Sequence, residues 1–151
     1  MNLGSLTDPQ LIYPDLPGET ADGVLHALAV RVAARGLVED AGKLEARLLE
    51  REQLGSTGIG AGVAVPHCKV KGLDRAVVAV GLKRRAIDFS AVDGEPVRLF
   101  FLVVSPDDQP AAHLQVLAAI SRWVKADEHV ERILGLSDRQ QIFDFLNGEG
   151  G

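Results

Sequence analysis

The chain has 151 residues, of which 46% are hydrophobic and 25% charged, and its net charge is −5 at pH 7, as in one globular domain with its own core. The acidic balance disfavours a nucleic-acid partner, because a phosphate backbone attracts a basic surface. No apolar run approaches the roughly 20 residues that span a bilayer, so we expect no membrane insertion. No signal-peptide pattern opens the chain, and the single cysteine fits a reducing compartment, so we expect a cytoplasmic location.

The N-terminal segment is marked by prolines. Three of them stand within the first 19 residues, at Pro9, Pro14 and Pro17. Because a proline disfavours helix at the residue before it, we expect an extended N-terminal arm over residues 1–19. The domain itself is then expected over residues 20–147, and the glycine-rich residues 148–151 should form a flexible tail.

Two helices are predicted next. Thr20 is placed to cap the first, whose apolar residues recur at helical spacing until Gly36 ends it. The second is expected over about residues 40–54. Arg51 therefore falls in its final turn, where an arginine either lies on the surface, favoured by the helix dipole, or turns its planar donor fork toward an anion.

Residues 55–67, with the sequence GSTGIGAGVAVPH, carry the most informative pattern. Glycines at nearly alternate positions let main-chain N–H groups approach an anion without interference from β-carbons. A short strand of small and β-branched residues follows, and a proline fixes the geometry where it ends. We therefore expect a phosphate-binding loop formed by Ser56, Thr57, Gly58, Gly60 and Gly62. The competing interpretation is an ordinary turn.

The histidine after this strand, His67, fits covalent chemistry. Neutral imidazole is a nucleophile, and its unperturbed pKa of about 6.5 leaves a large fraction unprotonated near pH 7. The loop lacks the Lys-Ser or Lys-Thr pair of a P-loop, and valine stands at position 63 where the dinucleotide fingerprint needs glycine. The pattern therefore indicates phosphate held on His67 rather than a bound nucleotide. The competing interpretation of His67 is a hydrogen-bonded loop residue.

Two continuous apolar runs, Ala76–Leu82 and Val97–Val104, are typical of strands buried in a sheet that is covered on both faces. Asp93-Gly94 between them predicts a turn and antiparallel pairing. The basic run Lys83-Arg84-Arg85 is interpreted as a solvated strand end. We expect an α/β fold: a single domain with a mixed parallel/antiparallel sheet of about five strands, flanked by helices on both faces.

Helices are predicted again toward the C-terminus. The first covers His113–Lys125 and places His113 in its first turn, where unpaired N–H groups favour a nearby anion. The alternative for His113 is an ordinary helix-start residue. Asp127 can cap a short helix. Ser137 with Gln140 makes a capping-box pattern for the last helix.

Residues 51–60 (REQLGSTGIG) and 63–67 (VAVPH) closely resemble the active-site segment of the phosphotransferase-system enzyme IIA family, of the fructose/mannitol type. The resemblance covers roughly residues 20–147 and is greatest to the nitrogen-regulatory branch. It implies that His67 is phosphorylated by a phosphohistidine carrier of the HPr type, with Arg51 and His113 in support. It implies no cofactor and no bound metal. We expect a regulatory role of the nitrogen type; the alternative is that the phosphoryl group passes to a sugar-specific EIIB during sugar uptake.

Two residues depart from the family pattern. Ala61 stands where the family commonly has asparagine, which removes a hydrogen-bonding side chain from the loop. Cys68 stands where the family commonly has glycine, which adds a side chain beside the reacting ring. We expect both departures to affect rate and partner choice more than the chemistry itself.

A different class of function would use His67, Cys68 and His113 to hold zinc. Adjacent side chains do not easily face one ion, and no Cys-x-x-Cys or His-x-x-x-His spacing accompanies them. A cysteine hydrolase with Cys68 as nucleophile and His67 as base meets a similar obstacle, because neighbouring residues rarely place thiol and base within hydrogen-bond reach. A non-catalytic metal-binding or interaction module is therefore the weaker alternative.

Overall fold

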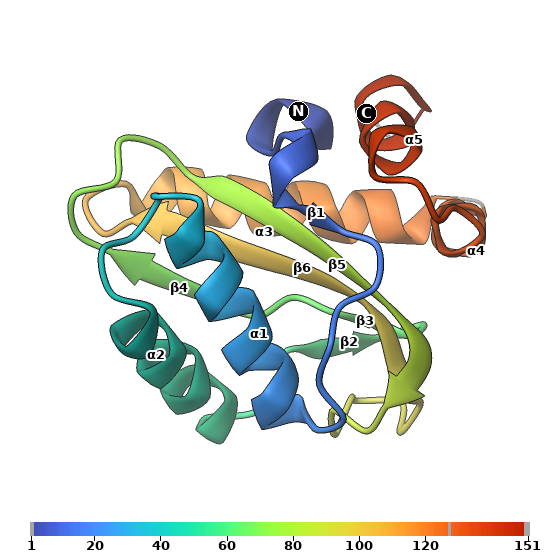
Figure 1. Ribbon diagram of the computed structural model, residues 1–151, viewed down its shortest axis with the longest axis horizontal. Helices are drawn as coiled ribbons and strands as arrows, with labels where there is room; N and C mark the ends of the chain where they lie inside the picture. Colours follow the sequence, from blue (N-terminus) through green and yellow to red (C-terminus); the bar gives the residue numbers. More distant parts are fainter. Residues whose placement is uncertain (1, 127, 150–151) are drawn as a thin grey trace.

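The computed structural model of the chain describes residues 2–126 and 128–149, and a six-stranded sheet lies at its centre (Figure 1). Five strands follow the order β1-β5-β6-β3-β2, and β4 pairs with β6 beyond β3. Pairing is antiparallel for β5 with β6 and for β2 with β3, and parallel elsewhere. The predicted mixed sheet is confirmed, with one strand more than expected. The strands are β1 (Ile12–Tyr13), β2 (Gly58–Gly60), β3 (Val63–Ala64), β4 (His67–Val70), β5 (Val77–Ile87) and β6 (Val97–Pro106).

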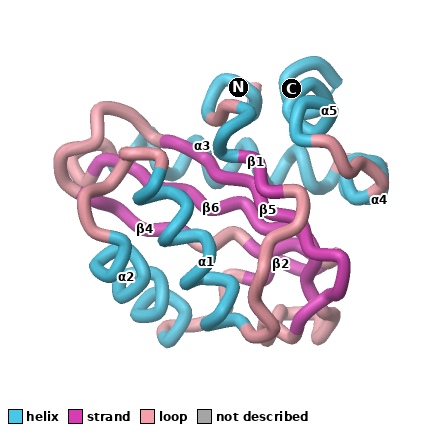
Figure 2. The backbone as a smooth tube through the Cα atoms, in the orientation of Figure 1, coloured by secondary structure: helices cyan, strands magenta, loops and turns pink. Residues whose placement is uncertain are grey.

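Helices cover both faces of this sheet, as predicted. In the orientation of Figures 1 and 2, α1 and α2 lie in front of the sheet and α3 behind it. The shorter α4 and α5 pack with α3 into the same core cluster. Within the described residues, no helix combines the length and apolar character needed to cross a membrane. The helices are α1 (Ala21–Ala34), α2 (Ala41–Gln53), α3 (Pro110–Lys125), α4 (His129–Leu134) and α5 (Arg139–Asp144).

The central strand β6 explains why two cores form. Side chains alternate along a strand, so Phe100 and Leu102 pack beneath α1 and α2, whereas Leu99 and Phe101 pack against α3. All four are completely buried. Burial of each such side chain contributes about 1.5–3 kcal/mol relative to exposure. The unbroken apolar run in the sequence is therefore the consequence of a strand with two dry faces.

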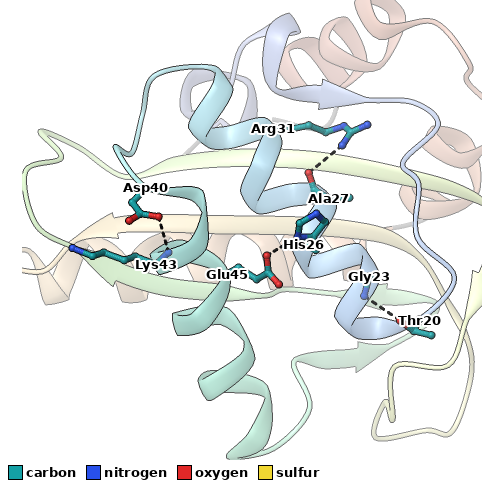
Figure 3. Close-up of polar contacts among 8 residues, drawn as sticks. All are labelled: Thr20, Gly23, His26, Ala27, Arg31, Asp40, Lys43 and Glu45. Atoms are coloured by element: carbon teal, nitrogen blue, oxygen red, sulfur yellow. Dashed lines mark hydrogen bonds and ion pairs between the residues drawn. The ribbon is translucent and has the colours of Figure 1, made fainter.

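Side-chain caps fix the start of both helices on the front face (Figure 3). The Thr20 hydroxyl accepts a hydrogen bond from the Gly23 amide at 3.0 Å, as predicted. The Asp40 carboxylate accepts one from the Lys43 amide at 3.1 Å. Each cap satisfies an amide that has no partner within its own helix, and its loss would cost about 1 kcal/mol. The Thr20 cap thus fixes where α1 begins, and the Asp40 cap fixes where α2 begins.

The N-terminal segment is not an extended arm, so that prediction is wrong for the described residues of 1–19. Leu3, Leu11 and Leu16 are each at most 2% exposed, and β1 pairs in parallel with β5. Leu16 packs so closely that a Cβ on Gly81 would lie 2.7 Å from its Cδ2 atom. Prolines restrict helix but do not prevent burial, and the apolar residues between them supply enough contact area to hold the segment on the sheet.

Strand β5 runs past its predicted end. The sequence favoured a strand over residues 76–82 with a solvated basic end, but the strand continues to Ile87 with a register irregularity after Leu82. Arg84 and Arg85 are exposed, whereas Lys83 is only 8% exposed. The interpretation of Lys83 as solvated is therefore wrong. Its ammonium donates a hydrogen bond to the Leu16 carbonyl at 3.0 Å, which the N-terminal segment brings to the sheet.

Two details differ near the C-terminus. The predicted cap at Asp127 lies outside the described residues, and α4 begins after Glu128. The last helix is capped by Asp138, whose carboxylate accepts from the Gln141 amide at 3.0 Å, so the capping box beginning at Ser137 is wrong by one residue. The chain then continues as a π-helical turn over Phe145–Glu149, which includes the first residues of the predicted tail. Residues 150–151 lie outside the described range.

Candidate functional site

His67 is the first residue of β4, and its position follows from an interrupted strand. β3 and β4 pair with β6 in one continuous register, Val63 opposite Leu99 and His67 opposite Val103. Pro66 lies in the interruption, and its carbonyl accepts a hydrogen bond from the Val103 amide at 2.9 Å. Both sides of the proline are thus anchored to β6, which fixes the backbone of His67.

The imidazole of His67 is held in one tautomer. Its Nδ1 atom lies 2.7 Å from the Val65 carbonyl oxygen. A carbonyl can only accept, so Nδ1 carries the proton and donates it, and the neutral ring keeps its lone pair on Nε2. Burial lowers the pKa of His67 below its usual value, the bond to Val65 raises it, and the charge of Arg51 lowers it. At pH 7 the ring is therefore predominantly neutral and nucleophilic at Nε2.

His113 lies beside His67, with ring centroids 5.4 Å apart and ring planes inclined by 53°. It stands in the first turn of α3, as predicted, and is 4% exposed. Its Nδ1 atom lies 2.7 Å from the hydroxyl of Ser105, a buried residue of β6. Burial, followed by the charges of His67 and Lys69, lowers the pKa of His113 to about 4. His113 is therefore a neutral neighbour of His67 at pH 7.

Arg51 occupies the last turn of α2, as predicted. Its Nη1 atom donates to the Gly55 carbonyl at 2.9 Å, which holds the guanidinium at the helix end. Its charge acts on His67, whose pKa it lowers. Arg51, His67 and His113 all line one surface cavity of about 700 Å³. The structure thus brings together the three residues selected from the sequence, from α2, β4 and α3.

The same cavity is electropositive. Besides Arg51, it is lined by Arg47 and Lys69, against the single carboxylate of Glu50. Arg47 donates from Nη1 to the Lys69 carbonyl at 2.8 Å and so ties α2 to the open edge of β4. Sequence reasoning missed both cations. Lys69 follows His67 by two positions in a strand, which is the spacing of residues on one face, so that signal was present.

The glycine-rich loop does not surround His67, and the prediction of a phosphate cradle is corrected. None of its five proposed residues lines the cavity. The hydroxyl of Ser56 donates to the Phe89 carbonyl, and both the amide and the hydroxyl of Thr57 bond to the Glu52 carboxylate. The glycines instead build the β2–β3 hairpin: Gly58 and Gly60 lie in β2, and Gly60 and Gly62 adopt φ values of 94° and 78° in and beside the turn.

The two departures from the family pattern lie differently. Ala61 sits at the tip of the hairpin turn with φ 58°, and its amide donates to Asp93 at 3.0 Å, so it does not reach the cavity. Cys68 does line the cavity, but its side chain packs with the core beneath α1 and α2. Burial raises the pKa of the Cys68 thiol to about 11. A thiol that stays protonated at pH 7 is a poor nucleophile, which disfavours a cysteine hydrolase built on Cys68.

Comparison with known proteins decides the family. Residues 5–149 match the model of the phosphoenolpyruvate-dependent sugar phosphotransferase system, EIIA 2. The chain belongs to this family. EIIA proteins are phosphotransfer proteins, so phosphotransfer is the general activity of this chain.

Individual relatives of the EIIA chain carry two kinds of name. This chain is 34% identical to a nitrogen regulatory protein of Bradyrhizobium diazoefficiens, over 97% of this chain and 95% of that one. It is 31% identical to a fructose-specific EIIA component of Haloferax volcanii, over 96% and 94%. The crystal structure of nitrogen regulatory protein IIA-Ntr from Neisseria meningitidis superposes with a TM-score of 0.88 at 26% identity, covering 95% and 98% of the two chains. Nearly equal identities do not separate the regulatory from the transport type.

Proposed function

We propose that this EIIA protein accepts a phosphoryl group on Nε2 of His67 from an HPr-type phosphohistidine carrier and serves in nitrogen-type regulatory signalling. The observation that carries the proposal is the hydrogen bond from His67 Nδ1 to the Val65 carbonyl, which leaves Nε2 as the nucleophilic atom. A carrier protein of this kind works in the cytoplasm, and we place the reaction there.

The proposed reaction is an in-line exchange between two imidazoles. A bond forms from Nε2 of His67 to phosphorus as the bond from phosphorus to the carrier's ring nitrogen breaks, and the carrier leaves as neutral imidazole. The His67 ring gains positive charge, which the Val65 carbonyl stabilises. Donor and acceptor are chemically alike, so the exchange is close to balanced, and catalysis reduces to alignment and neutralisation of the phosphoryl oxygens.

The neighbouring side chains have distinct roles in this scheme. Arg51 offsets the negative charge of the phosphoryl oxygens with its guanidinium. His113, kept neutral by its burial, accepts the Ser105 proton at Nδ1 and donates from Nε2 to a phosphoryl oxygen. The scheme needs no cofactor and no metal ion. Arg51 and His113 are therefore the supporting residues, and the five residues of the glycine-rich loop are left out of the site.

The surface around the cavity favours a protein as phosphoryl donor. Leu54 and Leu114 are 82% and 66% exposed, and both line the cavity that holds His67. Large apolar side chains at such exposure are typical of a protein-binding surface when they surround a site. A small phosphoryl donor would leave both leucines in water. A carrier that docks over the cavity would cover them while it presents its own phosphohistidine.

Transfer of labelled phosphate tests the acceptor. The chain is incubated with a phosphorylated carrier, and acid-labile, base-stable label is measured on His67→Gln and on the parent protein. A matched control is His26→Gln, since His26 lies on the surface of α1 with its Nδ1 atom 2.6 Å from Glu45 (Figure 3). We expect label on the parent and the control and none on His67→Gln. Label of parental intensity on His67→Gln would reject the proposal.

The regulatory assignment has a transport alternative, in which the protein passes phosphate to a sugar-specific EIIB. The Ser-Thr-Gly-Ile-Gly sequence at residues 56–60 favours the regulatory type, and relatives of both names exist. Partner capture with unmodified and phosphorylated protein separates the two. Recovery of an EIIB supports transport, whereas recovery of sensor kinases or potassium transporters supports regulation. Stoichiometric zinc in protein purified without added metal would instead favour the metal-binding alternative.

A further inference from the structure

A second cavity, of about 230 Å³, shares no lining residue with the cavity of His67. It is bounded by the N-terminal segment at Pro14, the far end of β5, and the connection between α4 and α5. Figure 1 shows β4 and α4 on opposite sides of the molecule. On β6, Leu99 pairs with Leu82, the residue before Lys83, and Val103 pairs with His67. Leu99 and Val103 are four positions apart, which is roughly 13 Å along the strand. The two cavities are therefore separate.

Three cations line this second cavity, Lys83, Arg84 and Arg98, against the carboxylate of Asp15. Asp15 lies 4.0 Å from Arg84, and both side chains are at least 70% exposed, so this contact neutralises little. Among the described residues, neither Lys83 nor Arg98 has a carboxylate within ion-pair distance. A local excess of positive charge thus persists in a chain whose net charge is −5.

Lys83 and Arg98 are held in place by main-chain carbonyls. Lys83 is 8% exposed, and its Nζ atom donates to the Leu16 carbonyl at 3.0 Å. Arg98 is half-buried, and its Nε atom donates to the Lys83 carbonyl at 3.0 Å. These bonds use one donor of each cation, and no other residue of the described chain bonds to the remaining donors of the ammonium and the guanidinium. Burial of a cation without an anion is costly, and a hydrogen-bonded anion offsets part of that cost.

We propose that this cavity binds a small organic dianion, either a dicarboxylate or a phosphate monoester. One anionic end would bond to Lys83 and Arg98, whose donors suit a carboxylate or a phosphoryl group, and the other would lie near Arg84. Leu134 and Leu136 line the same cavity and offer apolar contact to a carbon skeleton. A volume of about 230 Å³ equals that of roughly eight liquid waters, which limits the ligand to metabolite size.

An NMR titration of the full chain tests the proposal, with succinate and glycerol 3-phosphate as separate probes and chloride at matched ionic strength as reference. We expect saturable shifts at the amides of Lys83 and Leu136 for at least one probe. Saturation by succinate alone assigns a dicarboxylate, and saturation by the ester alone assigns a phosphate monoester. Any binding of the ester beside His67 gives its own curve at residues 67–69. No saturable shift at Lys83 with either probe would overturn the proposal.

Variants place the binding at these side chains. Arg98→Gln should weaken binding by about tenfold or more, because it removes one charged hydrogen-bonded contact to the anion. Arg84→Glu reverses an exposed charge without touching the core and should abolish saturation. Its matched control is Arg85→Glu, because Arg85 is exposed on the same strand and does not line the cavity. Should Arg98→Gln prove unstable, the Arg84 and Arg85 pair decides alone. If Arg84→Glu and Arg85→Glu weaken dianion binding equally, the effect is one of unspecific charge and the proposed site is wrong.

Discussion

The two ends of the sheet gather positive charge in different ways. Around His67, cations line a wide cavity of about 700 Å³ that also contains an imidazole with a free nitrogen. Around Lys83, cations line a cavity of about 230 Å³ that has neither histidine nor cysteine among its described lining residues. Both arrangements suit an anion, but only the first contains a nucleophile that can form a bond to phosphorus. Positive charge therefore predicts that an anion binds in each cavity, whereas the tautomer of His67 predicts phosphoryl transfer in the first cavity alone.

Removing the nucleophile is the strongest way to separate the two ends. His67→Gln should lose phosphoryl acceptance completely, because glutamine keeps a polar side chain but has no basic nitrogen. The same variant should keep the dianion-induced shifts at Lys83 that the parent gives, because the two cavities share no residue. Phosphorylation assays and NMR titration of one protein sample measure both. A loss of both properties in a folded variant would mean that the two ends are coupled.

The helices and the central strands could be predicted because their signals are local. Thr20 capped the first helix as its side chain indicated, and the apolar run over residues 97–104 became a strand with two buried faces. Arg51, His67 and His113 also met as the family resemblance implied. Each of these outcomes depends on periodicity, on a cap or on a motif, all of which are read within a few residues.

The parts that could not be predicted depend on pairing between distant segments. An amide in a glycine-rich loop can bind an anion only where it is not used in strand pairing, and here β2 pairs with β3 in a hairpin. The contact of His113 with Ser105 requires the packing of α3 on β6. The burial of Lys83 depends on the Leu16 carbonyl, which the expected N-terminal arm would have left in solvent. A charge pattern alone cannot reveal such partners.

The buried base beside His67 should be visible in the stability of the protein. The pKa of His113 is about 4 when folded and about 6.5 in an unfolded chain, so the unfolded state binds more protons between these values. Its contribution is complete above pH 6.5 and is lost as the pH falls toward 4, by about 3 kcal/mol at most. Denaturant unfolding of the parent and of His113→Gln measures this, and the variant should show the flatter decline. Parallel declines would contradict a buried neutral His113.

A cation at the reacting end should matter for rate rather than for folding. Arg51→Gln removes the guanidinium that offsets the phosphoryl charge, so transfer to His67 should slow by about 10- to 100-fold. The matched control is Arg85→Gln, an exposed arginine on β5 outside both cavities, which should keep the parental rate. Quenched-flow labelling gives the rates, and NMR shifts at Lys83 should respond to dianions as in the parent. An unchanged transfer rate in Arg51→Gln would remove Arg51 from the mechanism.

The smallest effect belongs to a position that touches neither cavity. Ala61 has φ 58°, a left-handed conformation that alanine adopts at a cost and asparagine tolerates better. Ala61→Asn should therefore raise the free energy of unfolding by about 0.5–1 kcal/mol, with transfer and dianion binding unchanged. The control is Ala46→Asn, the same substitution on an exposed position inside α2, which should lower stability because asparagine is the poorer helix former. Changes of the same sign at both positions would show that backbone strain at the hairpin tip is not the cause.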